Sequence, residues 1–140
     1  MQIKKGKGVY IIHIETGEDV LDSLKKVAEK ENLQSASIQG IGTTSFIELG
    51  YFNNVSKGYD TVQIEEDMEM LNVTGSISQK NGEPIVHLHG TFGDDEFNVF
   101  GGHVIEAKIL ATGEFFVYPC PKIERTLNAD FKLSLFDLDK

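Results

Sequence analysis

The feature that most constrains this chain is Asn81-Gly82, which lies between two stretches of strand character. Asn-Gly favours a two-residue type I′ turn, whose twist matches that of the antiparallel strands it joins. Apolar and polar residues alternate over Leu71–Ser78 before the turn, and Pro84–Phe92 follows it. Such a turn determines which residues of the two strands face each other. The predicted register pairs Lys80 with Glu83, Ser78 with Ile85, Ser76 with His87, and Thr74 with His89.

Two of the four histidines lie together on the second strand of this hairpin. Because side chains alternate along a strand, His87 and His89 share one face, with their Cα atoms roughly 7 Å apart. Imidazoles at this spacing can converge on one ion, and neutral imidazole is a frequent ligand of zinc and related metals. The hydroxyls of Thr74 and Ser76 opposite them suit a hydrated pocket, or the hydrogen bonds that orient metal ligands.

A third histidine, His103, follows the pair Gly101-Gly102. If Gly93–Phe97 forms a five-residue hairpin loop, His103 lies opposite His87 and Gly101 lies opposite His89. A four-residue loop would turn His103 to the other face, unless a bulge at the two glycines restored it. Because glycine has no side chain, Gly101 beside His89 would leave room for a ligand over the metal.

These patterns predict a metal site with an open position, and two alternatives stand beside it. One alternative is a polar strand face that carries unrelated histidines. The other is a purely structural metal that joins subunits, which requires a fourth protein ligand. The predicted metal is divalent, with zinc as the expected ion; no catalytic residue is assigned. The predicted ligands are His87, His89 and His103, and the possible pocket residues are Thr74, Ser76, Gly101 and Gly102.

The remaining patterns predict an α+β fold in a single domain, residues 1–140. A helix is expected from an N-cap at Thr16, with Asp19 in the reciprocal position, to about Asn32. Its apolar residues recur at helical spacing at Val20, Leu21, Leu24, Val27 and Ala28. We expect this one long helix to pack on a largely antiparallel sheet of seven or more strands. The other expected strands are Lys7–Glu15, Ser35–Ile41, Phe46–Phe52, Tyr59–Ile64, Val104–Val117 with a break at Ala111–Glu114, and Leu133–Leu138.

Charge and cysteine content narrow the functional classes. The net charge is −9 and Arg125 is the only arginine, whereas affinity for nucleic acid depends on neutralising phosphates with lysine and arginine. The single cysteine, Cys120, cannot form an internal disulfide and suits a reducing cytoplasm. No stretch resembles a signal peptide or a membrane span, so we expect a cytoplasmic protein without a membrane partner.

A set of short motifs, in this order, resembles the PPC (plants and prokaryotes conserved) domain. The resemblance runs from about residue 8 to residue 118 and leaves residues 119–140 as a C-terminal extension. It implies a homotrimer, a DNA-binding label, and a metal held by histidines in some prokaryotic members. The motifs are Gly17-Glu18-Asp19-Val20-Leu21, Gly40-Ile41-Gly42, Leu49-Gly50-Tyr51-Phe52, Gly75-Ser76-Ile77-Ser78, His87-Leu88-His89 and Gly101-Gly102-His103.

The histidine motif alone is also similar to that of α-acetolactate decarboxylase. In that enzyme the corresponding histidines hold zinc, and its pocket also uses an arginine and glutamates. Here the only arginine, Arg125, lies outside the matching region. The leading hypothesis is therefore a stand-alone, homotrimeric PPC-domain protein that binds a divalent metal and carries a DNA-binding label. The alternative is a zinc-dependent lyase or decarboxylase-like enzyme acting on a small 2-oxo or 2-hydroxy acid, with the metal as Lewis acid and an anion as ligand.

Overall fold

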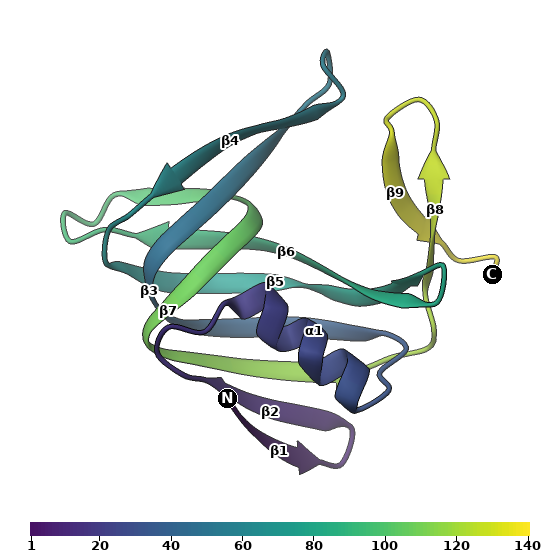
Figure 1. Ribbon diagram of the computed structural model, residues 1–140, viewed down its shortest axis with the longest axis horizontal. Coiled ribbons are helices and arrows are strands. Elements are labelled where there is room, and N and C mark those ends of the chain that lie inside the picture. The colour runs from purple at the N-terminus through teal and green to yellow at the C-terminus, as the bar shows by residue number, and fades with distance from the viewer.

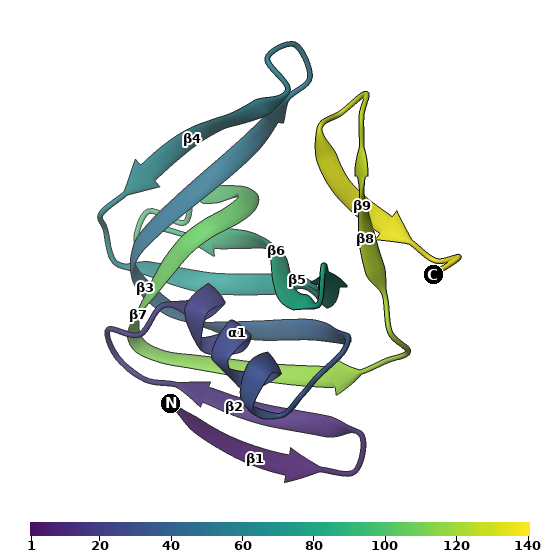
Figure 2. The same cartoon turned by 45° about the vertical axis from the view of Figure 1, so that its right-hand side comes forward.

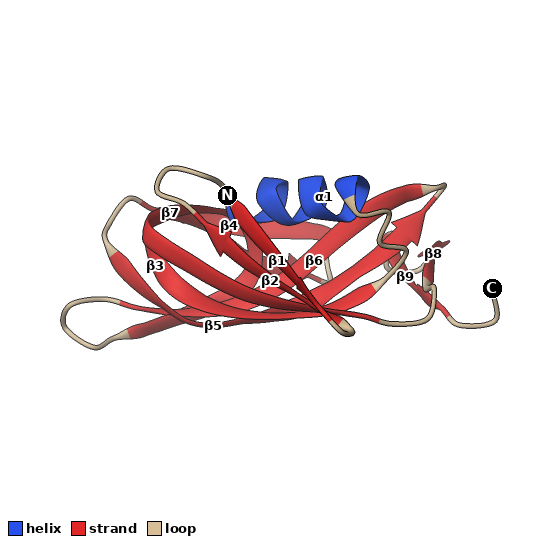
Figure 3. Ribbon diagram, turned by 90° about the horizontal axis from the view of Figure 1, so that it is seen from below, coloured by secondary structure: helices blue, strands red, loops and turns tan.

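A computed structural model describes all residues from 1 to 140 and contains nine strands and one helix (Figures 1 and 2). The helix α1 spans Val20–Lys30 and lies on one face of the sheet (Figure 3). No helix is long and apolar enough to cross a membrane. The strands are β1 (Gln2–Gly6), β2 (Val9–Ile14), β3 (Ala36–Asn53), β4 (Gly58–Ile64), β5 (Met68–Lys80), β6 (Glu83–Gly93), β7 (Val99–Pro119), β8 (Glu124–Asn128) and β9 (Leu133–Asp137).

Four strands pair in a closed cycle around the core. β3 pairs with β5 and β7, and β6 also pairs with β5 and β7, so every strand of the cycle has two partners within it. The long strands β3 and β7 change register with each other at several points, which lets them bend without ending. Twenty-two buried apolar residues form one core, to which α1 contributes Val20, Leu24, Val27 and Ala28.

The hairpin predicted from Asn81-Gly82 is confirmed. Both residues have positive φ, at 53° and 82°, as a type I′ turn requires. All four predicted pairs between β5 and β6 are present, including Ser76 opposite His87 and Thr74 opposite His89. The local turn geometry therefore determines which residues face the two histidines of β6.

The predicted α+β fold, with one long helix on a largely antiparallel sheet, is wrong. The chain is 66% strand and 8% helical, and its helix has 11 residues. The sheet is mixed, because β8 pairs in parallel with β5 through Gln79 and Glu124. The two strands expected at Ser35–Ile41 and Phe46–Phe52 form the single strand β3, since the bulges between them bend the strand without interrupting it.

The predicted N-cap of the helix is also wrong by one turn. Gly17 has a φ of 81°, which is outside the helical region, so the helix cannot begin at Thr16. Asp19 is the N-cap instead, and one of its carboxylate oxygens accepts a hydrogen bond from the backbone N–H of Asp22 at 2.9 Å. Its other oxygen accepts one from the N–H of Ala107 in β7 at 3.0 Å. One carboxylate thus caps the helix and ties it to the sheet.

Two hairpins extend away from the cycle of strands and approach each other at their ends. One, here called the β3–β4 arm, is the far end of β3 and the start of β4 around the turn at residues 54–57 (Figure 1). The other, the C-terminal hairpin, is formed by β8 and β9 (Figure 2). Lys57 of the arm lies over the ring of Phe131 of the hairpin, with its Nζ 5.0 Å from the ring centre.

A substitution at Gly75 tests the close approach of β5 and β6. A Cβ at this position would collide with the backbone carbonyl oxygen of His87, which cannot move aside as a flexible side chain would. We expect Gly75→Ala to lower the free energy of unfolding by about 1–3 kcal/mol, the usual cost of overpacking. Urea denaturation measures this cost. The control is Gly58→Ala, whose Cβ would meet nothing closer than 3.8 Å, and an equal loss in both variants would contradict the prediction.

Candidate metal site

Three histidines on two neighbouring strands meet near the middle of β6. His87 and His89 come from β6 and His103 comes from β7, and one ring nitrogen of each lies within 4.8 Å of the others. The ring centres are 5.1 Å apart for His87 and His89, 5.1 Å for His87 and His103, and 5.5 Å for His89 and His103. The structure thus brings together the residues that the sequence predicts as ligands, and their nitrogens could hold one metal ion.

The pairing of His103 with β6 differs from the predicted register. His103 pairs with His89 and not with His87, because the loop between β6 and β7 comprises residues 94–98 and not Gly93–Phe97. The predicted and the observed loop both have five residues, and the observed one begins one residue later. Each residue of β7 therefore pairs two residues further along β6 than predicted, which keeps its side chain on the same face of the sheet. His103 therefore still joins the other two histidines.

The electrostatics of the site favour neutral imidazoles, the form that binds metals. Burial lowers the pKa of His87 to about 4, with further contributions from Arg125, His103 and His89. Burial and the neighbouring His89 also lower the pKa of His103. The Nδ1 atom of His103 is buried without any hydrogen-bond partner. A buried polar atom without a partner is costly, and a metal ion would satisfy it.

An aromatic ring from the β3–β4 arm supports His103. Tyr59 of β4 stacks on it, with ring centres 4.7 Å apart and planes inclined by 24°. Gly50 of β3, which pairs with His103, makes room for this ring, because a Cβ there would come within 2.8 Å of Tyr59. Nothing in the sequence predicts Tyr59 as a site residue, because no local pattern relates it to His103.

The only arginine of the chain also enters the site, although the sequence places it outside the matching region. Arg125 of β8 donates from Nε to Ser78 Oγ at 2.7 Å and from Nη1 to the carbonyl oxygen of Ser134 at 2.8 Å. Its Nη2 lies 3.3 Å from Nδ1 of His87. Its guanidinium also stacks on Phe136, at 4.6 Å from the ring centre. Arg125 lies outside the matching region of the sequence, and the C-terminal hairpin brings it to the histidines by folding back onto β5 and β6.

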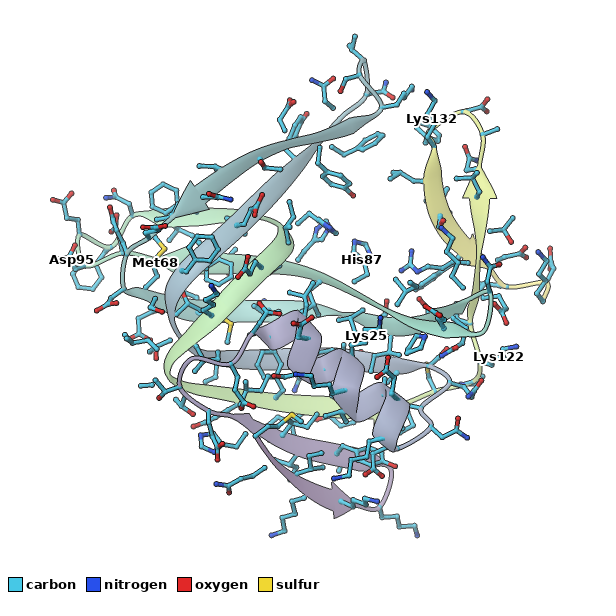
Figure 4. The ribbon with its side chains drawn as sticks, in the orientation of Figure 1. Lys25, Met68, His87, Asp95, Lys122 and Lys132 are labelled. Carbon is cyan, nitrogen blue, oxygen red and sulfur yellow. The ribbon has the colours of Figure 1, made fainter.

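A pocket of about 290 Å³ opens beside the histidines, between β6 and the C-terminal hairpin. Its polar lining includes His87, His103 and Arg125, together with Tyr59 and Lys80. The side chain of His87 points into the space between the β3–β4 arm and the C-terminal hairpin (Figure 4). The apolar lining residues are Ile85, Val86, Leu133 and Leu135.

The predicted pocket residues lie around the histidines on other sides. Thr74 and Ser76 face His89 and His87 across the β5–β6 pair. Gly102 pairs with Gly90, and Gly101 pairs with Thr91. Gly101 lines a separate hollow, together with residues of β3 and β4. None of these residues lines the pocket beside Arg125, and their role in ligand binding stays a prediction.

The fold and the site together define a small, mostly β domain with a three-histidine group open to a pocket. Residues 1–121 match the model of the Plants and Prokaryotes Conserved (PCC) domain, and the chain belongs to this family. The resemblance inferred from the motifs is thus confirmed. No curated protein matches the chain.

Solved structures of several related proteins share the whole fold. A candidate DNA-binding protein from Bacteroides thetaiotaomicron is 33% identical, with 99% of this chain and 98% of that chain covered and a TM-score of 0.96. A metal-containing protein from Archaeoglobus fulgidus is 27% identical, with 96% of each chain covered and a TM-score of 0.86. The α-acetolactate decarboxylase of Bacillus subtilis is 18% identical, with 89% of this chain and 58% of that chain covered and a TM-score of 0.58, a likeness of fold alone.

The lowered pKa of His87 predicts how acid affects the metal-free protein. The unfolded chain binds a proton at His87 near pH 6.5, whereas the folded chain does so only near pH 4. Protonation in this interval therefore favours unfolding, so the contribution of His87 to stability is complete above pH 6.5 and is lost as the pH falls towards 4. In urea denaturation of the chelator-treated protein, His87→Asn should flatten the dependence of stability on pH in this interval.

The matched control is His13→Asn, which replaces a histidine of β2 outside the site. It separates the loss of the buried His87 from the general effect of replacing a histidine with asparagine. Curves for the wild type and His87→Asn that run parallel across the interval would show that burial of His87 has no such consequence.

Proposed function

We propose that this PCC-domain protein binds one divalent metal ion, zinc, through His87, His89 and His103. The observation that carries the proposal is the buried Nδ1 of His103, which has no hydrogen-bond partner and lies in a group whose ligand nitrogens are within 4.8 Å of one another. All three histidines project from paired strands, which hold ligands more rigidly than loops do. Borderline-soft zinc suits an all-imidazole ligand set.

The donor set favours a site with an open position over a purely structural one. Structural zinc sites are closed by four protein ligands, whereas catalytic sites use three and leave the fourth for water or substrate. The group here contains three histidines and no fourth histidine, cysteine, aspartate or glutamate. When bound, the ion would supply a Lewis acid beside the pocket. This observation favours the second candidate function, a zinc-dependent lyase acting on a small 2-oxo or 2-hydroxy acid.

DNA binding is the function suggested by the description of the Bacteroides thetaiotaomicron protein. The charge of this chain opposes it, since 22 acidic residues face 13 lysines and arginines. The only arginine lies in the pocket, where one N–H on each of its three nitrogens contacts Ser78, Ser134 or His87. A lysine surface would have to supply all phosphate contacts against a net charge of −9. We therefore place the function at the histidine group.

Elemental analysis tests the metal site directly. The untagged wild type, purified without added metal and then exposed to zinc, should retain about one zinc ion per chain after dialysis. His89→Ala should retain less than about a tenth of that amount, because loss of a ligand leaves two histidines on one ion. The exposed position of His89 makes it the ligand whose removal disturbs packing least. Equal zinc content in the wild type and His89→Ala, with His13→Ala as control, would refute the site.

We also propose that the protein is a homotrimer, as the family resemblance implies. Several large apolar side chains are exposed on strands of the single chain, among them Tyr51, Leu71, Val99 and Phe100. Exposed apolar surface and unpaired strand edges are features that oligomers cover. We expect light scattering at micromolar concentration to give three times the chain mass of 15.5 kDa. A mass equal to that of one chain would rule out the oligomer.

A further inference from the structure

We propose that Arg125 and the pocket beside it bind a small carboxylate, a 2-oxo or 2-hydroxy acid with a short apolar side chain. This inference rests on the metal site proposed above and adds the residue that recognises the ligand. The starting observation is that Arg125, a half-buried cation in an acidic chain, has no anionic partner.

Arg125 is half-buried, and all its polar contacts are to neutral groups. Its hydrogen-bond partners are the hydroxyl of Ser78, the carbonyl of Ser134 and the imidazole of His87. None of the seven ion pairs of the chain includes it, although the chain has 22 acidic residues. Desolvating a charge is costly unless an opposite charge compensates it. A carboxylate bound in the pocket would supply the opposite charge that no protein side chain provides.

The donor geometry of Arg125 matches a carboxylate. A guanidinium has five N–H groups, and the three contacts use one on each nitrogen, which leaves one N–H on Nη1 and one on Nη2. Arginine binds a carboxylate in a bidentate way through one N–H on each of two nitrogens, and Arg125 keeps one N–H on each terminal nitrogen for this purpose. Lysine in the same place would offer a point charge without this geometry.

Metal binding would release a further donor. The guanidinium can only donate, so Nδ1 of His87 must accept through its lone pair. A neutral imidazole that coordinates through Nδ1 uses that lone pair for the metal, and one that coordinates through Nε2 carries its proton on Nδ1. In either case the hydrogen bond from Arg125 to His87 is lost. Nη2 then becomes free beside a second positive charge, and the affinity for an anion should rise.

The walls of the pocket limit the rest of the ligand. Ile85, Leu133 and Leu135 form an apolar side next to Arg125 and the histidines, in a volume of about 290 Å³. This pocket volume is at the lower end of the range for small-molecule sites, so the pocket admits only a small acid. Inorganic phosphate would satisfy the charge but would leave this apolar wall in contact with water. A carboxylate with an adjacent oxygen and a short alkyl group uses the arginine, the metal and the wall together.

Isothermal titration of the zinc-loaded protein with 2-oxobutanoate tests the proposal. Butanone is the matched ligand, because it replaces the carboxylate with a methyl group and keeps the carbonyl and the alkyl chain. We expect at least about tenfold weaker binding of butanone, of inorganic phosphate, and of 2-oxobutanoate to the zinc-free protein. Butanone loses the ion pair with Arg125, phosphate loses the apolar contact, and the zinc-free protein loses the metal. This comparison needs no variant and so does not depend on how substitutions affect folding.

Variants identify the residue. Arg125→Gln should weaken 2-oxobutanoate binding at least about tenfold while zinc content stays at that of the wild type, and Arg125→Lys should recover only part of the loss. The control is Lys122→Gln, which removes the positive charge of an exposed lysine that pairs with Glu124 outside the pocket. If zinc is retained but butanone binds as tightly as 2-oxobutanoate, or Arg125→Gln binds the acid unchanged, the carboxylate site is refuted. A wild type that retains no zinc would refute the metal site and this inference with it.

Discussion

The pairing of β6 with β5 on one side and with β7 on the other is the constraint on which the site depends. β6 pairs with β5 along its whole length and with β7 from His89 to Gly93, and it cannot slide on its own because each pairing specifies a register. This double pairing places His87 and His89 on one face and His103 directly beside His89. The same pairing needs Gly75, since only a residue without a side chain lets β5 approach the backbone at His87. The paired strands therefore hold the three histidines in fixed positions.

A second constraint is the distribution of charge. The chain is acidic overall, yet the region around the histidines contains a desolvated arginine with neutral partners. The C-terminal hairpin that carries this arginine lies beyond residue 121, where the match to the family model ends. Two hydrogen bonds at Ile123 tie its start to the domain. The carbonyl of Ile123 accepts one from the N–H of Gln79 at 2.8 Å, and the N–H of Ile123 donates one to the side-chain Oγ of Ser35 at 2.8 Å. The family domain thus supplies the histidines, and the extension supplies the cation and part of the apolar wall.

The helix shows why a clear local pattern led to a wrong prediction of the fold class. The apolar spacing of Val20, Leu24, Val27 and Ala28 is real, and these residues are buried against the sheet. The helix is nevertheless short, because Gly17 turns the chain before it and Asn32, at a φ of 51°, ends it. The strands are longer than their patterns indicate, because bulges keep β3 and β7 continuous where the alternation of apolar and polar residues breaks. Local periodicity detects each element but not where a bent strand continues.

The sequence by itself determined the features that depend on neighbouring residues. The Asn81-Gly82 turn dictates the β5–β6 register, and alternation along β6 puts His87 and His89 on one face. The predicted loop began one residue too early, so the predicted partner of His103 was two residues away from the actual one. A shift of two residues keeps a side chain on the same face of the sheet, and the predicted face of His103 is therefore correct. Tertiary structure alone decided the rest. Tyr59 and Arg125 reach the histidines through the β3–β4 arm and the C-terminal hairpin, which are distant in sequence and meet only when the sheet bends. Contacts of this kind leave no periodic signal, since no turn or repeat links the residues that make them.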